Sequence, residues 1–404
     1  MTAMFVLGAI IMACSSQPAA EPRVVEKIVE VEKVVEKEVE VPVEVVEKEV
    51  EVVKEIEVEV EKEVVKVERI EVPVEKVVEV QKIVEKEVEV VRSNLGESPD
   101  LAAQVAAGTL PAVWDRTPSQ PMIIPTLQDG IGEYGGVVRR FYLGPADGCN
   151  FFRLSRASLA RFSSDGFSFI PSVARGWEVN DNGTEWTFFL REGMKWSDGD
   201  DFNADDFVCQ YENVLLNTDL TPTPPLFLRI GSEVGSISKV DDTTVMFTFP
   251  VPNFLFLEIV AQADEACYGA TRNVPYAPSH YMQQFHIDFN AAVEEEANAA
   301  EFETWEQFYD SKTQYNLNPE KPTLAPWKFK NPLGDQVVMS ERNPYFWAVD
   351  PAGNQLPYLD GIQLSLVENT ELGTLRAVQG EIDMQGRLIQ THPCLLYTSD
   401  AADE

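Results

Sequence analysis

The chain has 404 residues, of which 67 are acidic and 32 are basic, so it carries a formal net charge of −35. It lacks the basic surface that phosphate contacts require, which excludes nucleic acid as an expected partner. It contains three histidines, no CxxC pair and no GxSxG, HExxH or GxxxxGK[ST] motif. The sequence therefore gives no support to a zinc site or to the enzyme classes that these motifs mark.

The amino terminus begins with an apolar run at residues 4–13, which ends in small residues before Cys14. The run is too short to cross a membrane and has the length of a signal-peptide hydrophobic region. The tetrapeptide that ends at Cys14 resembles the lipobox of bacterial lipoproteins. Residues 1–14 are therefore predicted to be a lipoprotein signal peptide with lipid attached at Cys14, which would anchor the chain to the outer face of the cytoplasmic membrane. An ordinary secretory signal that contains a cysteine by chance is the alternative.

Residues 15–92 are predicted to form a stalk, since from residue 24 to 91 the chain is almost only Val, Ile, Glu and Lys. The octapeptide VVEKEVEV occurs at 34–41 and at 45–52. This composition has too few large apolar residues to build a core. Strand-like and helix-like periodicities conflict and prolines interrupt both, so a spacer between membrane and domain is favoured over a coiled coil.

Residues 93–135 mix a short amphipathic helix with a Pro-rich extended run. They are predicted to be a linker that wraps onto a domain, with folding proper starting near Gly135. The stretch GGVVRRFYLG that follows is predicted to be a strand with a period of two residues.

The segment from residue 171 to 216 gives the clearest local predictions. Trp177–Val179 and Thr184–Leu190 are expected to be strands joined by a tight turn, in which Gly183 supplies a positive φ. Asn203 is expected to cap a helix that runs to about Leu216, with acidic residues in its first turn.

This segment resembles the signature of family 5 extracellular solute-binding proteins, which include the dipeptide and oligopeptide receptors of ABC importers. The matching positions are Pro171, Ala174, Trp177, Gly183, Leu190, Arg191, Trp196, Asp198, Gly199, Ala204 and Asp206. The resemblance continues through VDDTTVMFTF, PTLAPW and RNPYFW and covers about residues 136–390. It departs from the family at Asn203, where Thr is usual, and at Ala325, where Gly is usual.

The resemblance implies an α/β fold, a bilobal periplasmic-binding-protein-like clamp of type II in which the solute binds between two lobes. By the family's chain order, residues 136–153 and 240–390 would form lobe I and residues 154–239 an extra α/β domain. The second lobe would follow Met384, so it is expected to be missing. Residues 394–404 match the translation of a sequencing-library adapter and are predicted to be an artefact, so this version is expected to be a fragment that cannot close on a ligand.

The function implied is that of the substrate-binding component of an ABC importer, which captures peptides outside the cytoplasmic membrane and delivers them to the permease subunits. No catalysis, cofactor or metal is expected. An oligosaccharide or another solute is the alternative ligand. A secreted hydrolase or a stalked surface adhesin is less favoured. The carboxylates that a hydrolase would use are Asp198, Asp200, Asp205 and Asp206.

Three residues are candidates for contact with the solute. Asp147 and Asn150 follow the first strand of the domain, where the family contacts its ligand, and Trp327 occupies the position of a family tyrosine. The competing interpretations are that Asp147 and Gly148 simply make a turn and that Trp327 packs in the core. Apart from Cys14 and Cys394, the cysteines are Cys149, Cys209 and Cys267, which permit one disulfide with a free thiol or none.

Overall fold

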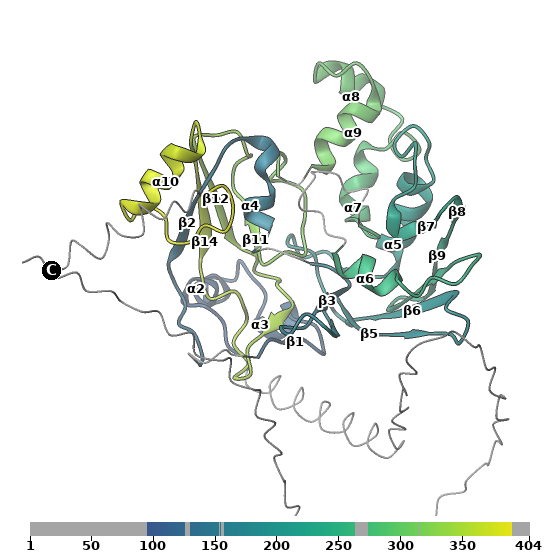
Figure 1. Cartoon of the computed structure of the whole chain (residues 1–404), viewed down its shortest axis with the longest axis horizontal. Coiled ribbons are helices and arrows are strands. Elements are labelled where there is room, and N and C mark those ends of the chain that lie inside the picture. Colours follow the sequence, from purple (N-terminus) through teal and green to yellow (C-terminus); the bar gives the residue numbers. More distant parts are fainter. Residues whose placement is uncertain are drawn as a thin grey trace, which may run out of the picture. The chain divides into compact units, whose positions relative to one another are not determined.

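The computed structural model describes residues 95–125, 130–152, 154, 157–262, 274–314 and 316–389. Within these ranges short helices alternate with strands, and most strands belong to two four-stranded sheets (Figure 1). The mixed α/β fold expected from the sequence is confirmed. The predicted signal peptide with Cys14, the stalk, Cys267 and the tail at 394–404 lie outside the described residues.

The first sheet has the strand order β5-β6-β10-β9, with antiparallel neighbours throughout. Its strands are Ala174–Val179 (β5), Glu185–Leu190 (β6), Ser236–Asp241 (β9) and Thr244–Thr248 (β10). β5 and β6 form the predicted hairpin, and Gly183 has the left-handed backbone (φ 66°) that its turn requires.

The boundary predicted between residues 239 and 240 is wrong, because it falls inside β9 and separates β10 from its partners. β10 pairs with β6 on one side and with β9 on the other. Helix α6 (Phe256–Gln262) then packs on the same sheet, where the ring of Phe256 lies 4.9 Å from that of Phe247 and 6.0 Å from that of Phe188. Strand β10 and helix α6, which follow β9, are therefore part of the same sheet and its packing as β5 and β6, which the sequence placed in the extra domain.

Helix α5 (Ala204–Gln210) begins where the sequence predicts. The side chain of Asn203 accepts a hydrogen bond from the backbone of Asp205, and that of Asp206 accepts one from the backbone of Asn203, which forms a capping box. A single π-helical turn, η2 (Tyr211–Leu215), carries the helix almost to the predicted end. Helices α7 (Ser279–Met282), α8 (Val293–Ala299) and α9 (Trp305–Thr313) share a second apolar cluster with η2, and Figure 1 shows them grouped near α5.

The second sheet joins distant parts of the chain in the order β11-β12-β14-β2. Its strands are Trp327–Phe329 (β11), Val337–Arg342 (β12), Gly361–Leu366 (β14) and Val137–Tyr142 (β2). β2 is parallel to β14, and the other pairs are antiparallel. β2 is the predicted strand, but its last three residues are all buried, so its burial does not alternate. Helix α10 (Thr370–Val378) explains this, because Gly373 lies directly against the ring of Phe141.

Residues 95–123 belong to the folded domain, which corrects the prediction that folding starts near Gly135. Helices α2 (Pro99–Ala106) and α3 (Val113–Arg116) precede strand β1 (Met122–Ile123), which pairs in parallel with β13 (Ala348–Val349). The side chain of Met122 is part of the main apolar core. The segment therefore contributes a strand and core residues instead of only wrapping onto a finished domain.

The remaining short elements connect these parts. They are η1 (Pro145–Asp147), α4 (Cys149–Phe152), β3 (Ala160–Phe162), β4 (Phe169–Pro171), η3 (Leu226–Leu228), β7 (Arg229–Ile230), β8 (Glu233–Val234) and η5 (Gln283–Phe285). Among the residues that the structure describes, none of the helices is both long enough and apolar enough to cross a bilayer.

Candidate functional site

A cavity of about 560 Å³ is lined jointly by β3, the end of α6, the start of β11 and the segment between β13 and β14. Its volume falls within the range of about 300–1,000 Å³ that small-molecule sites occupy. Four aromatic side chains contribute to its walls, namely Phe162, Trp327, Phe346 and Tyr358. A hollow with apolar and aromatic walls is suited to a solute with an apolar or flat surface.

Trp327 packs in the apolar core of the second sheet and also lines this cavity. Core packing and a position at the cavity, which were competing interpretations, are therefore compatible. The side chain of Trp327 belongs to the apolar cluster of the second sheet and is 8% exposed. Its indole Nε1–H donates to the carbonyl of Leu359 at 3.1 Å. That hydrogen bond fixes the orientation of the ring, which leaves its apolar surface as the part available to a solute. Contact of Trp327 with the ligand stays a prediction.

Arg161 is the only charged side chain among the described residues that line the cavity. It stands in the middle of β3, paired with Ile170 of β4. Burial lowers the pKa of its guanidinium, yet an arginine remains charged at neutral pH. Nothing in the local pattern LARFSS distinguishes a strand arginine that faces a cavity from one that faces water, so Arg161 is not a candidate from sequence alone.

Asp147 and Asn150 lie together but in a buried polar network, apart from the lining of the cavity. Asn150 is fully buried, and its Nδ2 donates to the Phe141 carbonyl and to Asp147 Oδ2, both at 3.0 Å. The guanidinium of Arg387 lies 3.1 Å from Asp147 Oδ1, and that of Arg140 donates to the Asn150 carbonyl. Burial raises the pKa of Asp147, although these partners oppose the shift.

This network holds the loop after β2 in place. The side-chain oxygens and amide of both residues face protein groups, which is an arrangement that stabilises a loop. A turn at Asp147 and Gly148 was the competing interpretation, and the 3₁₀ turn η1 at Pro145–Asp147, with Gly148 as its C-cap, is found there. Direct contact of Asp147 and Asn150 with a ligand stays a prediction, and it would require the network to open.

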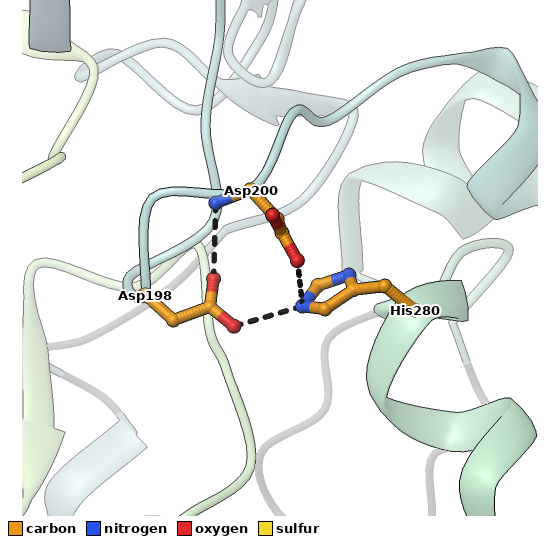
Figure 2. Close-up of side chains that lie close together, drawn as sticks. All are labelled: Asp198, Asp200 and His280. Atoms are coloured by element: carbon orange, nitrogen blue, oxygen red, sulfur yellow. Dashed lines mark hydrogen bonds and ion pairs between the residues drawn. The ribbon is translucent and has the colours of Figure 1, made fainter.

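The acidic residues considered for a hydrolase divide into two groups. Asp205 forms an ion pair with Lys239 at 2.9 Å, and Asp206 is buried within the capping box. Figure 2 shows the other pair, in which Asp198 Oδ2 and Asp200 Oδ2 approach the same ring nitrogen, Nε2 of His280, at 2.8 and 3.2 Å. His280 comes from α7, about 80 residues later in the chain, so its proximity could not be inferred from local sequence.

The chemistry of this cluster fits an ion pair better than a metal centre or a catalytic dyad. Its three donor groups lie within 4.8 Å of one another, as metal ligands would. However, the Nε2 of His280 already bonds to both carboxylates, and the two aspartates are largely exposed. A calcium loop, which the sequence resembles faintly, would present oxygen ligands instead of an imidazole. The cluster is thus explained as a bridge between the 198–200 turn and α7.

The stability of this bridge should depend on pH. Partial burial disfavours the charged imidazole, but the hydrogen bond and charge of Asp198, with Asp200 and Asp206, outweigh burial and raise the pKa of His280. Since the folded pKa exceeds the unfolded value of about 6.5, the stabilisation is complete below that pH and is lost as the pH rises through the raised pKa. Replacing His280 by glutamine is expected to flatten the pH dependence of stability above about pH 6.5.

Chemical denaturation of both proteins across this pH range measures the effect. Asp201→Asn is the matched control, because Asp201 lies in the same turn but pairs with Lys195. The control should keep the wild-type slope. An unchanged slope in His280→Gln would contradict the proposed ion pair.

Comparison with known proteins gives a consistent picture. The family described as bacterial extracellular solute-binding proteins, family 5 (middle) matches residues 168–395. The periplasmic alpha-galactoside-binding protein of Rhizobium meliloti (strain 1021) is 30% identical over 282 residues, which are 65% of this chain and 38% of that protein. The periplasmic oligopeptide-binding protein OppA of Salmonella typhimurium is 28% identical over 215 residues, 53% of this chain and 34% of that protein.

Solved structures give the same result. An oligopeptide-binding protein OppA superposes with a TM-score of 0.67 at 37% identity, over 73% of this chain and 45% of that one. The periplasmic binding protein MelB of Agrobacterium fabrum C58, solved with stachyose, has a TM-score of 0.55 at 25% identity, over 72% of this chain and 43% of that one. The chain thus spans less than half of the length of each relative that it matches.

Proposed function

The chain belongs to family 5 of the bacterial extracellular solute-binding proteins, and on this premise we propose that it is the substrate-binding component of an ABC importer. It captures a solute, preferentially a peptide, outside the cytoplasmic membrane and delivers it to the permease subunits. Its chemistry is binding without catalysis, because the carboxylates considered for a hydrolase have structural partners. The observation that supports this proposal most directly is the aromatic cavity at the start of β11.

Peptides are favoured as the solute by the names of several relatives. Besides OppA, these include di/tripeptide-binding protein 1 of Pseudomonas aeruginosa, which is 32% identical over 145 residues. Oligosaccharides are the second candidate, since the alpha-galactoside-binding relative matches over a longer stretch and MelB was solved with stachyose. Aromatic walls suit both, because the rings of peptide side chains and the flat faces of sugars pack on them equally well.

The proposed location is the outer face of the cytoplasmic membrane. A lipid on Cys14 would supply the anchor, and the Val, Glu and Lys-rich segment would act as a spacer. Relatives named as periplasmic support a location outside the cytoplasm. The lipid anchor and the spacer rest on the sequence pattern alone.

The function is tested by purifying the full chain under native conditions and identifying the small molecules that accompany it by mass spectrometry. The melting temperature is then followed while a tripeptide mixture or stachyose is added. We expect co-purified peptides and a rise in melting temperature with the peptides, because the cavity lies within the described part of the chain and contact with its walls does not require closure of a second lobe. Retention of sugars alone would replace the peptide proposal by the oligosaccharide one. An absence of bound solute together with no thermal shift would contradict a binding function and favour a surface adhesin.

A further inference from the structure

The cavity has a single charge and no described group to balance it. Arg161 lines it, whereas no aspartate or glutamate is found among the described lining residues. Neither a hydrogen bond nor an ion pair joins the guanidinium of Arg161 to any residue that the structure describes, and burial is the sole cause of its lowered pKa. Arg161 is half-buried, and a partly desolvated charge without a partner is unfavourable, so its position calls for an explanation.

The fully buried arginines of the described chain show how this protein surrounds a desolvated guanidinium. Arg116 donates to Glu97, to Gln355 and to a backbone carbonyl. Arg191 donates to the carbonyls of Ser172 and Gln120 at 2.9 and 2.7 Å. Each guanidinium is surrounded by oxygen acceptors. Arg161, which is half-buried, lacks such protein acceptors, so its guanidinium is open to water or to an incoming solute in the cavity.

The other polar side chains on the wall form no hydrogen bond with Arg161 among the described residues. The hydroxyl of Tyr358 donates to Asp350 at 2.5 Å, the indole N–H of Trp327 to Leu359, and the hydroxyl of Ser158 to the Ala160 carbonyl at 2.7 Å. The donor hydrogens of these groups are engaged within the protein, and the hydroxyl of Ser172 is the remaining polar side-chain group of the described lining. The cavity thus offers an incoming molecule apolar and aromatic surface together with one guanidinium.

A guanidinium in such surroundings selects a particular ligand chemistry. Its planar fork matches the two oxygens of a carboxylate, and the pair strengthens when water is excluded. One arginine neutralises one negative charge, so a monoanion fits better than a phosphate dianion. We propose that Arg161 binds a carboxylate group of the solute while the aromatic walls hold its apolar part. This inference rests on the proposed function and narrows it, because a peptide carries a carboxylate and a neutral oligosaccharide does not.

The test compares two probes that differ only in this group. A phenylalanine-containing tripeptide with a free terminal carboxylate and the same peptide as its terminal amide are titrated into the full chain by ligand-observed NMR. Replacing Arg161 by glutamine is expected to weaken binding of the free acid by about ten- to a hundredfold and to change binding of the amide less than about twofold. Arg161→Lys, which keeps the charge but not the fork, should give an intermediate loss.

Arg175→Gln is the matched control. Arg175 lies on β5, where it is exposed and does not line the cavity. Its guanidinium carbon lies 5.2 Å from the centre of the Phe189 ring. It should leave both affinities unchanged. Melting curves exclude misfolding: Arg161→Gln should melt at the wild-type temperature or about 2 °C above it, because an unpaired, half-buried charge has been removed.

The remaining outcomes separate this inference from the proposed function. Equal weakening of acid and amide in Arg161→Gln, or weakening of neither, would overturn the carboxylate site and leave peptide binding intact. Wild-type protein that binds stachyose but neither peptide would overturn the carboxylate site and support the oligosaccharide alternative. Wild-type protein that binds none of the three would overturn both.

Discussion

Replacing Arg342 by leucine is expected to lower the free energy of unfolding by about 2–4 kcal/mol. The side chain of Arg342 is 2% exposed and donates to Ser98 Oγ at 2.6 Å, Asp100 at 2.7 Å and Asp360 at 2.7 Å. It also donates to the carbonyls of residues 357 and 358 at 2.9 and 2.8 Å. Leucine removes all these donors and leaves buried acceptors unpaired, whereas the two carboxylates are half-exposed and regain water.

Urea denaturation of the wild type and the variant measures this change. Lys328→Leu is the control, because Lys328 forms a more exposed ion pair with Glu341 on the adjacent strand and should cost less than about 1 kcal/mol. Arg342→Leu should also weaken solute binding, since the carbonyls it holds belong to residues 357 and 358, which line the cavity. A variant as stable as the control would show that the segment around Ser98 is only loosely attached.

The contacts of this segment explain why the start of the domain was predicted too late in the chain, near Gly135. Ser98 and Arg342 are 244 positions apart, and the strand that follows α2 pairs with β13, more than 220 residues downstream. Two-residue strands such as β1 have no periodicity that a pattern could detect. This Pro-rich run becomes a strand only through its pairing with β13. Its local sequence carries no sign of that pairing, so it was predicted to be a linker.

Predictions from sequence were correct where the interacting residues lie close together in the chain. The hairpin of β5 and β6, the positive φ of Gly183 and the Asn203 cap depend on residues fewer than twenty positions apart, and each was predicted correctly. The boundary predicted at 239–240 follows the family's chain order, and it falls inside β9, whose sheet β10 completes. The sequence suggested the family and Trp327 at the cavity, but not Arg161 or His280, since their surroundings are assembled from separate segments.

Replacing Asp206 by asparagine is expected to destabilise the fold by about 2–4 kcal/mol, although the two side chains have the same shape. Asp206 is 2% exposed and accepts four hydrogen bonds. Its Oδ2 receives them from Trp196 Nε1 at 3.0 Å and Asn203 N at 3.2 Å, and its Oδ1 from the backbone N and Oγ of Ser279 at 3.0 and 2.8 Å. Whichever way the asparagine amide is oriented, its NH₂ group would replace one carboxylate oxygen. That NH₂ group would then face two groups that are themselves hydrogen-bond donors.

This effect separates a structural role for Asp206 from a catalytic one. Its carboxylate joins the 196–203 turn to the start of α7, so its loss should expose Trp196, which thermal unfolding followed by tryptophan fluorescence would detect. Asp205→Asn is the matched control, because Asp205 is the neighbouring residue on α5, is exposed and forms an ion pair with Lys239. This substitution should change the free energy of unfolding by less than about 1 kcal/mol. If Asp206→Asn were as stable as Asp205→Asn, the four hydrogen bonds would not hold the turn, and a catalytic or ligand-binding role for this buried carboxylate would have to be reconsidered.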